Sequence, residues 1–310
     1  MIAITGADGF IGSHLFKYLL KKGIKARKIN RSGDDNSIAI GNLSSKTDWF
    51  IALENIETLV HCASIPNFVN KGTSSIDELN EVNIEATRNM AEQASKMGVK
   101  RIIFISTIKV NGEVTLKNQK FNELSKPNPQ EPYAISKFEA ENILKSISQK
   151  NNIELLIIRS PIVYGEFVKG NFLTLINLVY NAIPLPLNKI NNSRSIIYVG
   201  NLVYLIYLCI INKDLKSKTL LVSDNQSIST RGLVKLLAKK LRKRILFFYL
   251  PKFLMIFIFN FLKKRNSLSS FIDSLEIDSR ESYRFLNAKL PFTTEEGIKK
   301  TIKWFMEQKT

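Results

Sequence analysis

The sequence predicts an α/β fold, in which a doubly wound parallel sheet is joined to a smaller C-terminal lobe. Two observations predict it. Apolar runs alternate with helical stretches through the first half of the 310 residues, and a glycine-rich turn follows the first apolar run. Six such strand–helix units make a parallel sheet the expected core, because parallel strands need crossover connections between them.

The first unit carries the glycine-rich turn TGADGFIGSHL. Residues 1–4 are too short to be anything but a buried strand, and residues 10–20 have apolar side chains at helical spacing, so the glycines fall on a strand-to-helix turn. Gly6 permits a tight turn, Gly9 lets a phosphate approach, and Gly12 lets the helix pack close to the sheet. The turn predicts a Rossmann-like dinucleotide site, and a glycine-rich turn without a ligand is the alternative.

The following units show the same alternation of apolar and amphipathic stretches. Strands are expected at 24–30, 37–40, 57–62 and 101–105, and helices at 48–53 and 77–97. Because the carboxyl ends of parallel strands meet at one edge of a sheet, we expect Gly6, Ala63 and Thr107 to converge on one ligand crevice.

Composition narrows the class of protein. A chain of this length, with 45% hydrophobic and 23% charged residues, can hold a nucleotide-binding domain and a smaller one. The net charge of +18 comes from Lys and Arg spread along the chain, without interleaved aromatic residues, so nucleic acid is not an expected partner. We expect part of this charge to attract an anionic cofactor and a diphosphate-bearing substrate.

The cysteine residues suggest a cytoplasmic protein, and the few histidine residues argue against a metal site. Cys62 and Cys209 lie in apolar runs, which indicates reduced core residues of a cytoplasmic protein. The hydrophobic start is only a few residues long, so no signal peptide is expected. His14 and His61 are too few for a metal site, and each is expected to be a packed or loop residue.

The end of the second expected strand bears on the choice of cofactor. An NAD-selective site usually has a carboxylate there, whereas Arg31 followed by Ser32 suits a 2′-phosphate. The sequence therefore favours NADP(H). NAD(H) stays open because Asp34 and Asp35 follow closely.

Tyr133 and Lys137 open a helix just after three prolines. Their spacing of four puts the phenol and the ammonium on one helix face. A free tyrosine is a poor base at neutral pH, but an adjacent lysine and the positive charge of a bound nicotinamide both favour the phenolate. Such a phenol can exchange a proton with a sugar hydroxyl or ketone while hydride moves, and Thr107 could orient the same oxygen.

Seven motifs, taken in order, resemble the extended short-chain dehydrogenase/reductase family, in its nucleotide-sugar epimerase/dehydratase/reductase branch. The motifs are TGADGFIGSHL, HCAS (61–64), VNIEATRNM (82–90), FISTIKVNG (104–112), PYAISK (132–137), IRSPIVYGE (158–166) and RSIIYVGNLV (194–203). Weaker similarity continues through SLEIDS and EEGIKKTIKWF.

The resemblance implies a catalytic triad of Thr107, Tyr133 and Lys137, with Tyr133 as the acid/base and Lys137 bonding the nicotinamide ribose. Thr107 and Tyr133 would also contact the substrate. Further cofactor contacts are implied at Phe10, Ile11, Asn42, Leu43, Ala63, Asn83 and Pro161. Asn42 departs from the aspartate that relatives usually carry near the adenine. Contacts to the substrate's diphosphate are implied at Asn171, Arg194 and Arg284.

The resemblance also narrows the reaction. Relatives that act as 4,6-dehydratases carry an acidic pair after the triad hydroxyl, where this chain has Ile108 and Lys109. The segments STIKVNGE, KGNFLTLI and PLPLNKINNSRSIIYVGNLV resemble bacterial enzymes that reduce UDP-4-keto-6-deoxy-N-acetylhexosamines, or are named 4-epimerases. We expect such a 4-ketoreductase of surface-glycan biosynthesis. The alternatives are a 4-epimerase of UDP-hexose or UDP-N-acetylhexosamine, reduction of a non-nucleotide ketone, and a non-catalytic NAD(P)-binding sensor or assembly protein.

Two domains are expected. Residues 1–164 and about 195–225 would form the NAD(P)-binding Rossmann domain, and residues 165–194 and about 226–310 the substrate-binding lobe. Whether the chain forms a homodimer is left open.

The lobe contains the apolar stretch 245–262 between the basic triplets RKR and KKR. Pro251 and Lys252 disfavour a membrane-spanning helix. A buried helix of the lobe is expected, with an interfacial helix on an anionic membrane as the alternative. Peripheral contact with the inner face of a membrane through residues 245–265 thus stays open.

Overall fold

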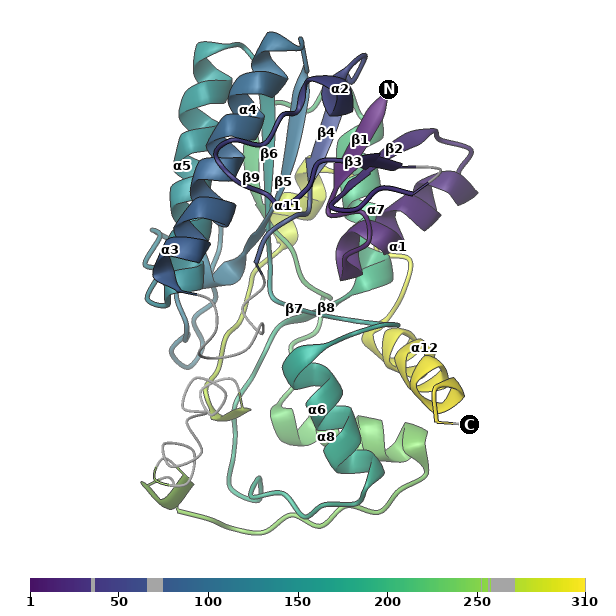
Figure 1. The fold of residues 1–310 in the computed structure, drawn as a ribbon. Coiled ribbons are helices and arrows are strands. Elements are labelled where there is room, and N and C mark those ends of the chain that lie inside the picture. The colour runs from purple at the N-terminus through teal and green to yellow at the C-terminus, as the bar shows by residue number, and fades with distance from the viewer. Residues whose placement is uncertain (35–36, 66–74, 252, 256, 258–270, 310) are drawn as a thin grey trace.

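Seven parallel strands form the central sheet of the computed structural model, which describes residues 1–34, 37–65, 75–251, 253–255, 257 and 271–309. Their order is β3-β2-β1-β4-β5-β6-β9 (Figure 1). The strands are β1 (Ile2–Thr5), β2 (Ala26–Asn30), β3 (Ser37–Ala39), β4 (Thr58–His61), β5 (Arg101–Thr107), β6 (Glu154–Ser160) and β9 (Lys218–Leu221). The predicted doubly wound parallel sheet is confirmed, and the order reverses between β1 and β4, where such sheets bind ligands.

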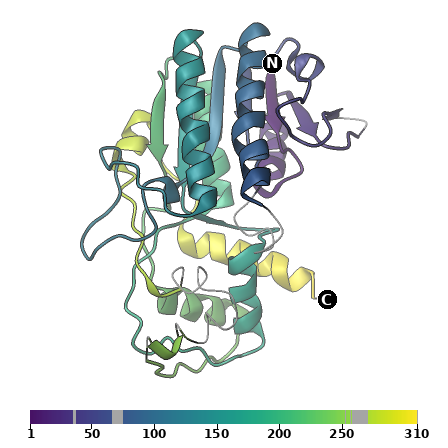
Figure 2. The same ribbon diagram turned by 60° about the vertical axis from the view of Figure 1, so that its left-hand side comes forward.

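Helices cover both faces of the sheet (Figures 1 and 2). On one face α1 (Phe10–Lys21) packs beside α7 (Val199–Ile211), and on the other α4 (Ala86–Lys96) packs beside α5 (Pro132–Lys150). The central strands are apolar on both sides because each side faces one of these helix layers. Short α2 (Phe50–Leu53) lies near β3, and the 3-10 turn η2 (Ile108–Val110) follows β5 directly.

The long helix expected at 77–97 is divided into three parts. It begins as α3 (Ile76–Leu79), continues as the π-helix η1 (Asn80–Glu85) and ends as α4. The side chain of Ser75 caps α3 by accepting from the amide of Glu78. A π-helical turn widens the backbone locally, and such turns are frequent at functional sites.

The remaining elements lie below the sheet in Figure 1. They are the two-stranded ribbon of β7 (Ile162–Tyr164) and β8 (Ile196–Tyr198), with α6 (Gly170–Tyr180), α8 (Thr230–Leu241) and α12 (Thr294–Glu307). The buried carboxylate of Asp224 joins β7 to α7, because it accepts from the hydroxyl of Tyr164 at 2.8 Å and from the side-chain amide of Asn201 at 2.7 Å. We propose that α6, α8 and α12 belong to the substrate-binding lobe.

The start of the apolar stretch 245–262 is extended chain, so the helix expected there is wrong for this part. Phe247 forms a β-bridge with Leu185, and Ile245 and Phe247 pack on the main core. Helical structure is described only from Phe253, because the residue before Pro251 is sterically driven away from the helical conformation. Residues 252, 256 and 258–265 lie outside the described part of the chain.

No helix among the described residues is both long enough and apolar enough for a membrane span. The apolar stretch 245–262 nevertheless contains several exposed aromatic side chains. Phe248, Tyr249, Phe253 and Phe257 are all exposed, the last two at 69%.

Candidate active site

The glycine-rich turn is closed by two backbone contacts that only glycine allows. Gly6 has φ +62°, and a Cβ atom there would lie 2.8 Å from the backbone N and Cα of Ala63 at the end of β4. A Cβ atom on Gly12 would lie 2.2 Å from the carbonyl oxygen of Gly6. The turn therefore packs directly on the neighbouring strand end and on the first turn of α1.

This turn leaves the N-terminus of α1 open to an anion. Gly9 is the N-cap residue and has no side chain to accept from the first helical amides. Phe10 and Ile11 follow it, half-buried against the core. Free amides and a positive helix end fit the pyrophosphate of a dinucleotide, so the cradle that the sequence predicts suits NAD(P).

Tyr133 lies at the same sheet edge as this turn. Its side chain hydrogen-bonds with Ser64, which follows Ala63 directly, and Ala63 is the residue that Gly6 touches. The N-terminus of α5 is thus brought to the glycine turn through β4. Burial raises the pKa of Tyr133 to about 12, and the hydrogen bond with Ser64 opposes this rise. The phenol alone is a weak base at neutral pH, so positive charge from a ligand would be needed to favour phenolate.

Lys137 lies one turn further along α5 and is almost fully buried, with 2% of its surface exposed. Its ammonium lies 3.9 Å from the ring centroid of Phe104. Burial lowers the pKa of Lys137 to about 7, while Glu141 and Cys62 act in the opposite direction. An ammonium held in such a dry site is poised to donate to hydroxyl groups of a bound ribose.

Thr107 ends β5 and caps η2, where its hydroxyl oxygen accepts from the amide of Lys109 at 3.3 Å. Thr107 is the last residue of β5 and Tyr133 lies in the first turn of α5. Both elements have these ends at the carboxyl edge of the parallel sheet.

A buried ion pair that no sequence motif indicates fixes α5 to the sheet. Glu141 is fully buried and accepts from Arg159 of β6 at 3.0 and 2.5 Å and from Ser106 of β5 at 2.6 Å. Arg159 also donates to Asn111, which follows η2. These bonds hold the helix of Tyr133 and Lys137 against the two strands beside it. A lone Glu on a helix carries no motif that would reveal them.

An open hollow of about 440 Å³ lies at the end of β2, lined by Arg31, Ser32, Gly41 and Asn42. No carboxylate ends the strand. Asn30 takes that place, and its amide donates to Asp8 and accepts from the amide of Gly33. Asp34 pairs with Lys28 at 2.8 Å, while Asp35 lies outside the described residues.

The other residues implied for the cofactor fall around the same edge. Leu43 packs on the core beneath β2 and β3, and Pro161 is buried at the end of β6. Asn83 of η1 links two site segments, because it accepts from the amide of Ile65 at 2.9 Å and donates to Ser136 of α5 at 3.0 Å. Its amide group therefore shapes the crevice wall.

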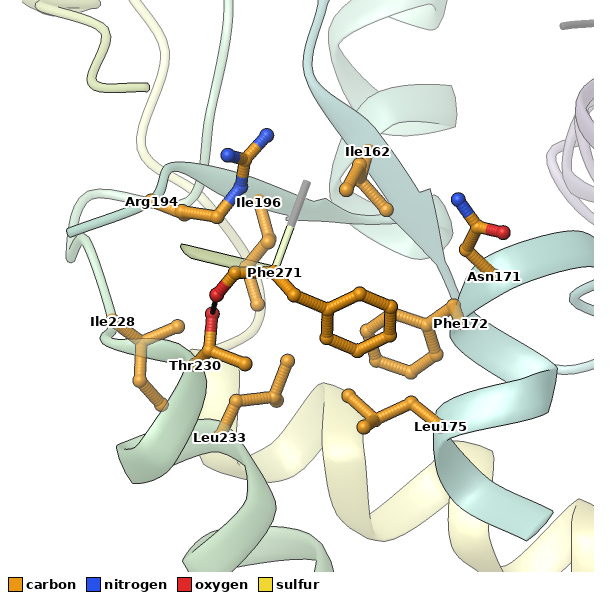
Figure 3. A pocket seen from close by; sticks show the side chains of 10 residues that line it. All are labelled: Ile162, Asn171, Phe172, Leu175, Arg194, Ile196, Ile228, Thr230, Leu233 and Phe271. Carbon is orange, nitrogen blue, oxygen red and sulfur yellow. Dashed lines mark hydrogen bonds between the residues drawn. The ribbon is translucent and has the colours of Figure 1, made fainter. Parts of the chain in front are cut away.

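Asn171 and Arg194 line one cavity below the sheet, of about 50 Å³, at whose rim they stand on either side of Ile162 (Figure 3). The other lining residues are Phe172, Leu175, Ile196, Ile228, Thr230, Leu233 and Phe271. Arg194 is 8% exposed and donates to the carbonyl oxygen of Asp273 at 2.7 Å. Burial lowers its pKa to about 10.

The structure does not bring Arg284 to this cavity. It lies on α11 (Arg280–Phe285), with a side chain 77% exposed and a guanidinium 3.8 Å from Glu281. The helix is fixed through Ser282, which donates to Glu123 and accepts from the amide of Leu221. This face of α11 is used for packing on β9, so Arg284 points to solvent.

The two histidines are structural neighbours of the site. His61 is buried, stacks on Phe104 and lies 2.8 Å from the hydroxyl of Thr5. Burial, aided by the charge of Lys137, lowers its pKa to about 3, so it stays neutral. His14 packs on Phe10 and Phe167.

Comparisons with known proteins agree with this fold. The family model of the NAD dependent epimerase/dehydratase family matches residues 2–222. A UDP-glucose 4-epimerase of Vibrio cholerae is 35% identical over 99% of this chain and 95% of its own length. The N-acetyl-α-D-glucosaminyl-diphospho-ditrans,octacis-undecaprenol 4-epimerase of Escherichia coli O157:H7 is 28% identical over 81% of this chain and 75% of its own.

A UDP-glucuronic acid 4-epimerase of Bacillus cereus, solved with UDP-glucuronic acid and NAD, has the same fold. It superposes with a TM-score of 0.81 at 19% identity and covers 99% of each chain. The chain belongs to the NAD-dependent epimerase/dehydratase family. The resemblance stated from the motifs and the interpretation as an enzyme are confirmed.

Gly6→Ala should destabilise the protein and abolish NAD(P) binding. The left-handed φ costs an alanine about 1–2 kcal/mol, and the clash with Ala63 adds about 1–3 kcal/mol. Gly23→Ala is the matched control, because Gly23 has φ +73° but open space around it. Denaturant unfolding and cofactor titration of both variants test this, and equal losses in the two would contradict it.

Lys137→Met should remove a pH dependence of stability. The folded-state pKa is about 7 and the ordinary value 10.5, so between these pH values the unfolded chain binds more protons at this group. The wild type should therefore gain stability relative to the variant as pH rises from 7 towards 10. Thermal unfolding across this range measures the difference. Lys150→Met, an exposed position on the same helix, should follow the wild type, and a flat difference for Lys137→Met would refute the account.

Proposed function

We propose that the chain is an NAD(P)-dependent oxidoreductase that acts at C4 of a UDP-sugar. One observation carries this: Tyr133 reaches the glycine turn through Ser64 and Ala63, with Lys137 one helical turn away. Bound NAD(P) supplies the hydride donor and acceptor. Tyr133 exchanges a proton with the C4 oxygen, Thr107 orients that oxygen, and Lys137 holds the nicotinamide ribose.

Charge and relatives support a sugar nucleotide as the substrate. Arg194 is the buried cation of the cavity below the sheet, and Asn171 adds an amide at the same rim. Both side chains suit a diphosphate, and the net charge of +18 on the chain would attract such an anion. The relatives named above include enzymes of UDP-glucose and UDP-glucuronic acid.

The particular reaction that we propose first is reduction of a UDP-4-keto-6-deoxy-N-acetylhexosamine in bacterial surface-glycan biosynthesis. The segments resembling such reductases support it. Dehydration is disfavoured, because Ile108 is buried and Lys109 is paired with two glutamates where a dehydratase has its acidic pair. A UDP-hexose 4-epimerase is the second candidate, supported by the name of the Vibrio cholerae relative, which matches nearly the whole chain.

NADP(H) is the proposed cofactor. Arg31 and Ser32 line the hollow at the end of β2, and the residue that ends the strand is an amide, Asn30. Asp34 is held by Lys28. NAD(H) is the alternative, supported by the NAD bound to the Bacillus cereus relative.

We also propose a cytoplasmic protein that contacts the inner face of a membrane through the stretch 245–265. Exposed Phe253 and Phe257 and the basic triplet 242–244 support this contact. So does the Escherichia coli relative, whose name specifies an undecaprenol-linked substrate. A homodimer remains a further proposal that the described surface leaves open.

Tyr133→Phe should lower turnover by at least about 100-fold, because general acid–base help is worth about 10² to 10⁴ in rate. The test supplies UDP-4-keto-6-deoxy-GlcNAc with NADH or NADPH, and separately UDP-glucose and UDP-GlcNAc without a reductant, followed by nicotinamide absorbance and product NMR. Cofactor affinity should survive in the variant. Full activity of Tyr133→Phe, or a wild type inert towards all three sugars, would overturn the proposal.

Phe253→Asp with Phe257→Asp should weaken binding to vesicles of phosphatidylglycerol and phosphatidylethanolamine by at least about tenfold, because two apolar side chains would be lost from the interface. Co-sedimentation measures it. Leu124→Asp changes a side chain that is 91% exposed outside this stretch and should bind like the wild type. Equal binding by the double variant and the wild type would remove the membrane contact.

A further inference from the structure

A cluster of charged side chains lies directly beside the triad. Lys109 of η2 places its ammonium 2.8 Å from a carboxylate oxygen of Glu113, Oε2, and also contacts the carboxylate of Glu131. Glu131 is the N-cap residue of α5, two positions before Tyr133. The three side chains are only 15–18% exposed. The cluster thus connects the element after Thr107 to the helix that carries the phenol.

Only one of the two carboxylate oxygens of Glu113 has a partner among the described residues. Oε2 is held by Lys109, whereas the other oxygen, Oε1, is buried and accepts no hydrogen bond from any residue that the structure describes. Burial raises the pKa of this carboxyl, and Lys109 opposes the rise. A buried acceptor without a donor is costly, and native proteins rarely leave one without a functional reason.

Arg194 and Glu113 interact electrostatically, yet no ion pair within 4.0 Å joins these two described residues. The Nε atom of Arg194 is also buried, and no acceptor for it is found in the described part of the chain. Figure 3 shows its guanidinium directed away from Leu233 and Phe271, out of the apolar part of the cavity.

The chemistry of a hexose suggests what fits beside Glu113. On the proposed function, C4 lies at Tyr133 and Thr107, and the diphosphate on C1 lies towards Arg194. Glu113 is linked to the C4 end of this arrangement because Lys109 contacts both Glu113 and Thr107. It is linked to the diphosphate end by its electrostatic interaction with Arg194. A carboxylate oxygen requires a donor, which the ring oxygen cannot supply. The donor nearest to the diphosphate is the substituent on C2.

We propose that Glu113 determines substrate specificity by accepting a hydrogen bond, through Oε1, from the hydroxyl or amide N–H on C2 of the hexose; this rests on the proposed function. Lys109 is a positioning residue here. It occupies Oε2, which leaves Oε1 as the oxygen that would accept from the sugar. The same lysine fixes the start of α5 through Glu131, so sugar recognition and the placement of Tyr133 share one cation.

The test measures dissociation constants of UDP-glucose and UDP-2-deoxyglucose for the NAD(P)-loaded protein. The wild type should bind UDP-glucose at least about tenfold more tightly, because a hydrogen bond to a charged group is lost with the 2-deoxy sugar. Glu113→Ala should bind the two sugars equally. Glu113→Gln keeps an acceptor oxygen, so it should retain part of the preference for UDP-glucose. This variant also keeps the test valid if Glu113→Ala folds poorly.

The control variant is Glu123→Ala, because the carboxylate of Glu123 is engaged by Ser282 of α11. It should show the preference of the wild type. A full preference for UDP-glucose in both Glu113 variants would overturn the proposal. So would wild-type affinity that falls for UDP-3-deoxyglucose but not for UDP-2-deoxyglucose.

The same measurements separate this inference from the proposed function. If UDP-glucose binds with the expected preference and no hydride moves at C4 of UDP-glucose, UDP-GlcNAc or UDP-4-keto-6-deoxy-GlcNAc, the proposed function fails and the recognition by Glu113 stands. If the wild type turns over one of these sugars while Glu113→Ala keeps the preference, the inference alone fails. If the wild type binds neither UDP-glucose nor UDP-2-deoxyglucose and turns over none of the three sugars, both fail.

Discussion

The close approach of the glycine turn to the end of β4 is the constraint on which the site depends. Gly6 has φ +62°, and a Cβ atom added there would lie 2.8 Å from the backbone of Ala63, so the turn lies directly on the neighbouring strand. Two consequences follow from this one contact. The open N-terminus of α1 is aimed at the crevice, and Ser64 is placed where it meets Tyr133. A side chain at position 6 would separate the anion site from the acid/base.

Electrostatics in the crevice is arranged around buried cations. Lys137 is kept in a dry site beside Phe104, where Glu141 and Cys62 favour its charge but do not outweigh the effect of burial. Lys109 is stabilised by two glutamates, and Arg194 by the carbonyl oxygen of Asp273. Buried charge of this kind is costly without partners, so a bound diphosphate and ribose would relieve part of the cost. The crevice is thereby suited to an anionic ligand.

Much of this could be predicted from the sequence, since the glycine spacing and the parallel-strand pattern have local physical causes. Gly6, Gly9 and Gly12 fall on the turn for steric reasons that hold in any such fold. What could not be predicted depends on contacts between distant segments. The Glu141–Arg159 pair joins a helix to a strand, and the orphaned oxygen of Glu113 depends on where Arg194 lies.

Two expectations depended on alignment or local hydropathy and did not match the structure. Arg284 was placed by a weakly similar segment, and packing of Ser282 on β9 turns it to solvent. The apolar stretch starting at residue 245 suggested a helix, but pairing of Phe247 with Leu185 and the following Pro251 keep its first part extended. Both contacts join residues that are far apart in the chain, so a short stretch of sequence does not reveal them.

The most direct test of the central claim follows the hydride itself. The protein is given UDP-4-keto-6-deoxy-GlcNAc together with NAD(P)H that carries deuterium at C4 of the nicotinamide, and the sugar product is analysed by NMR. Reduction and epimerisation share this step, so our account predicts one deuterium on C4 of the hexose. Deuterium on another carbon, or none although both ligands bind, would contradict it.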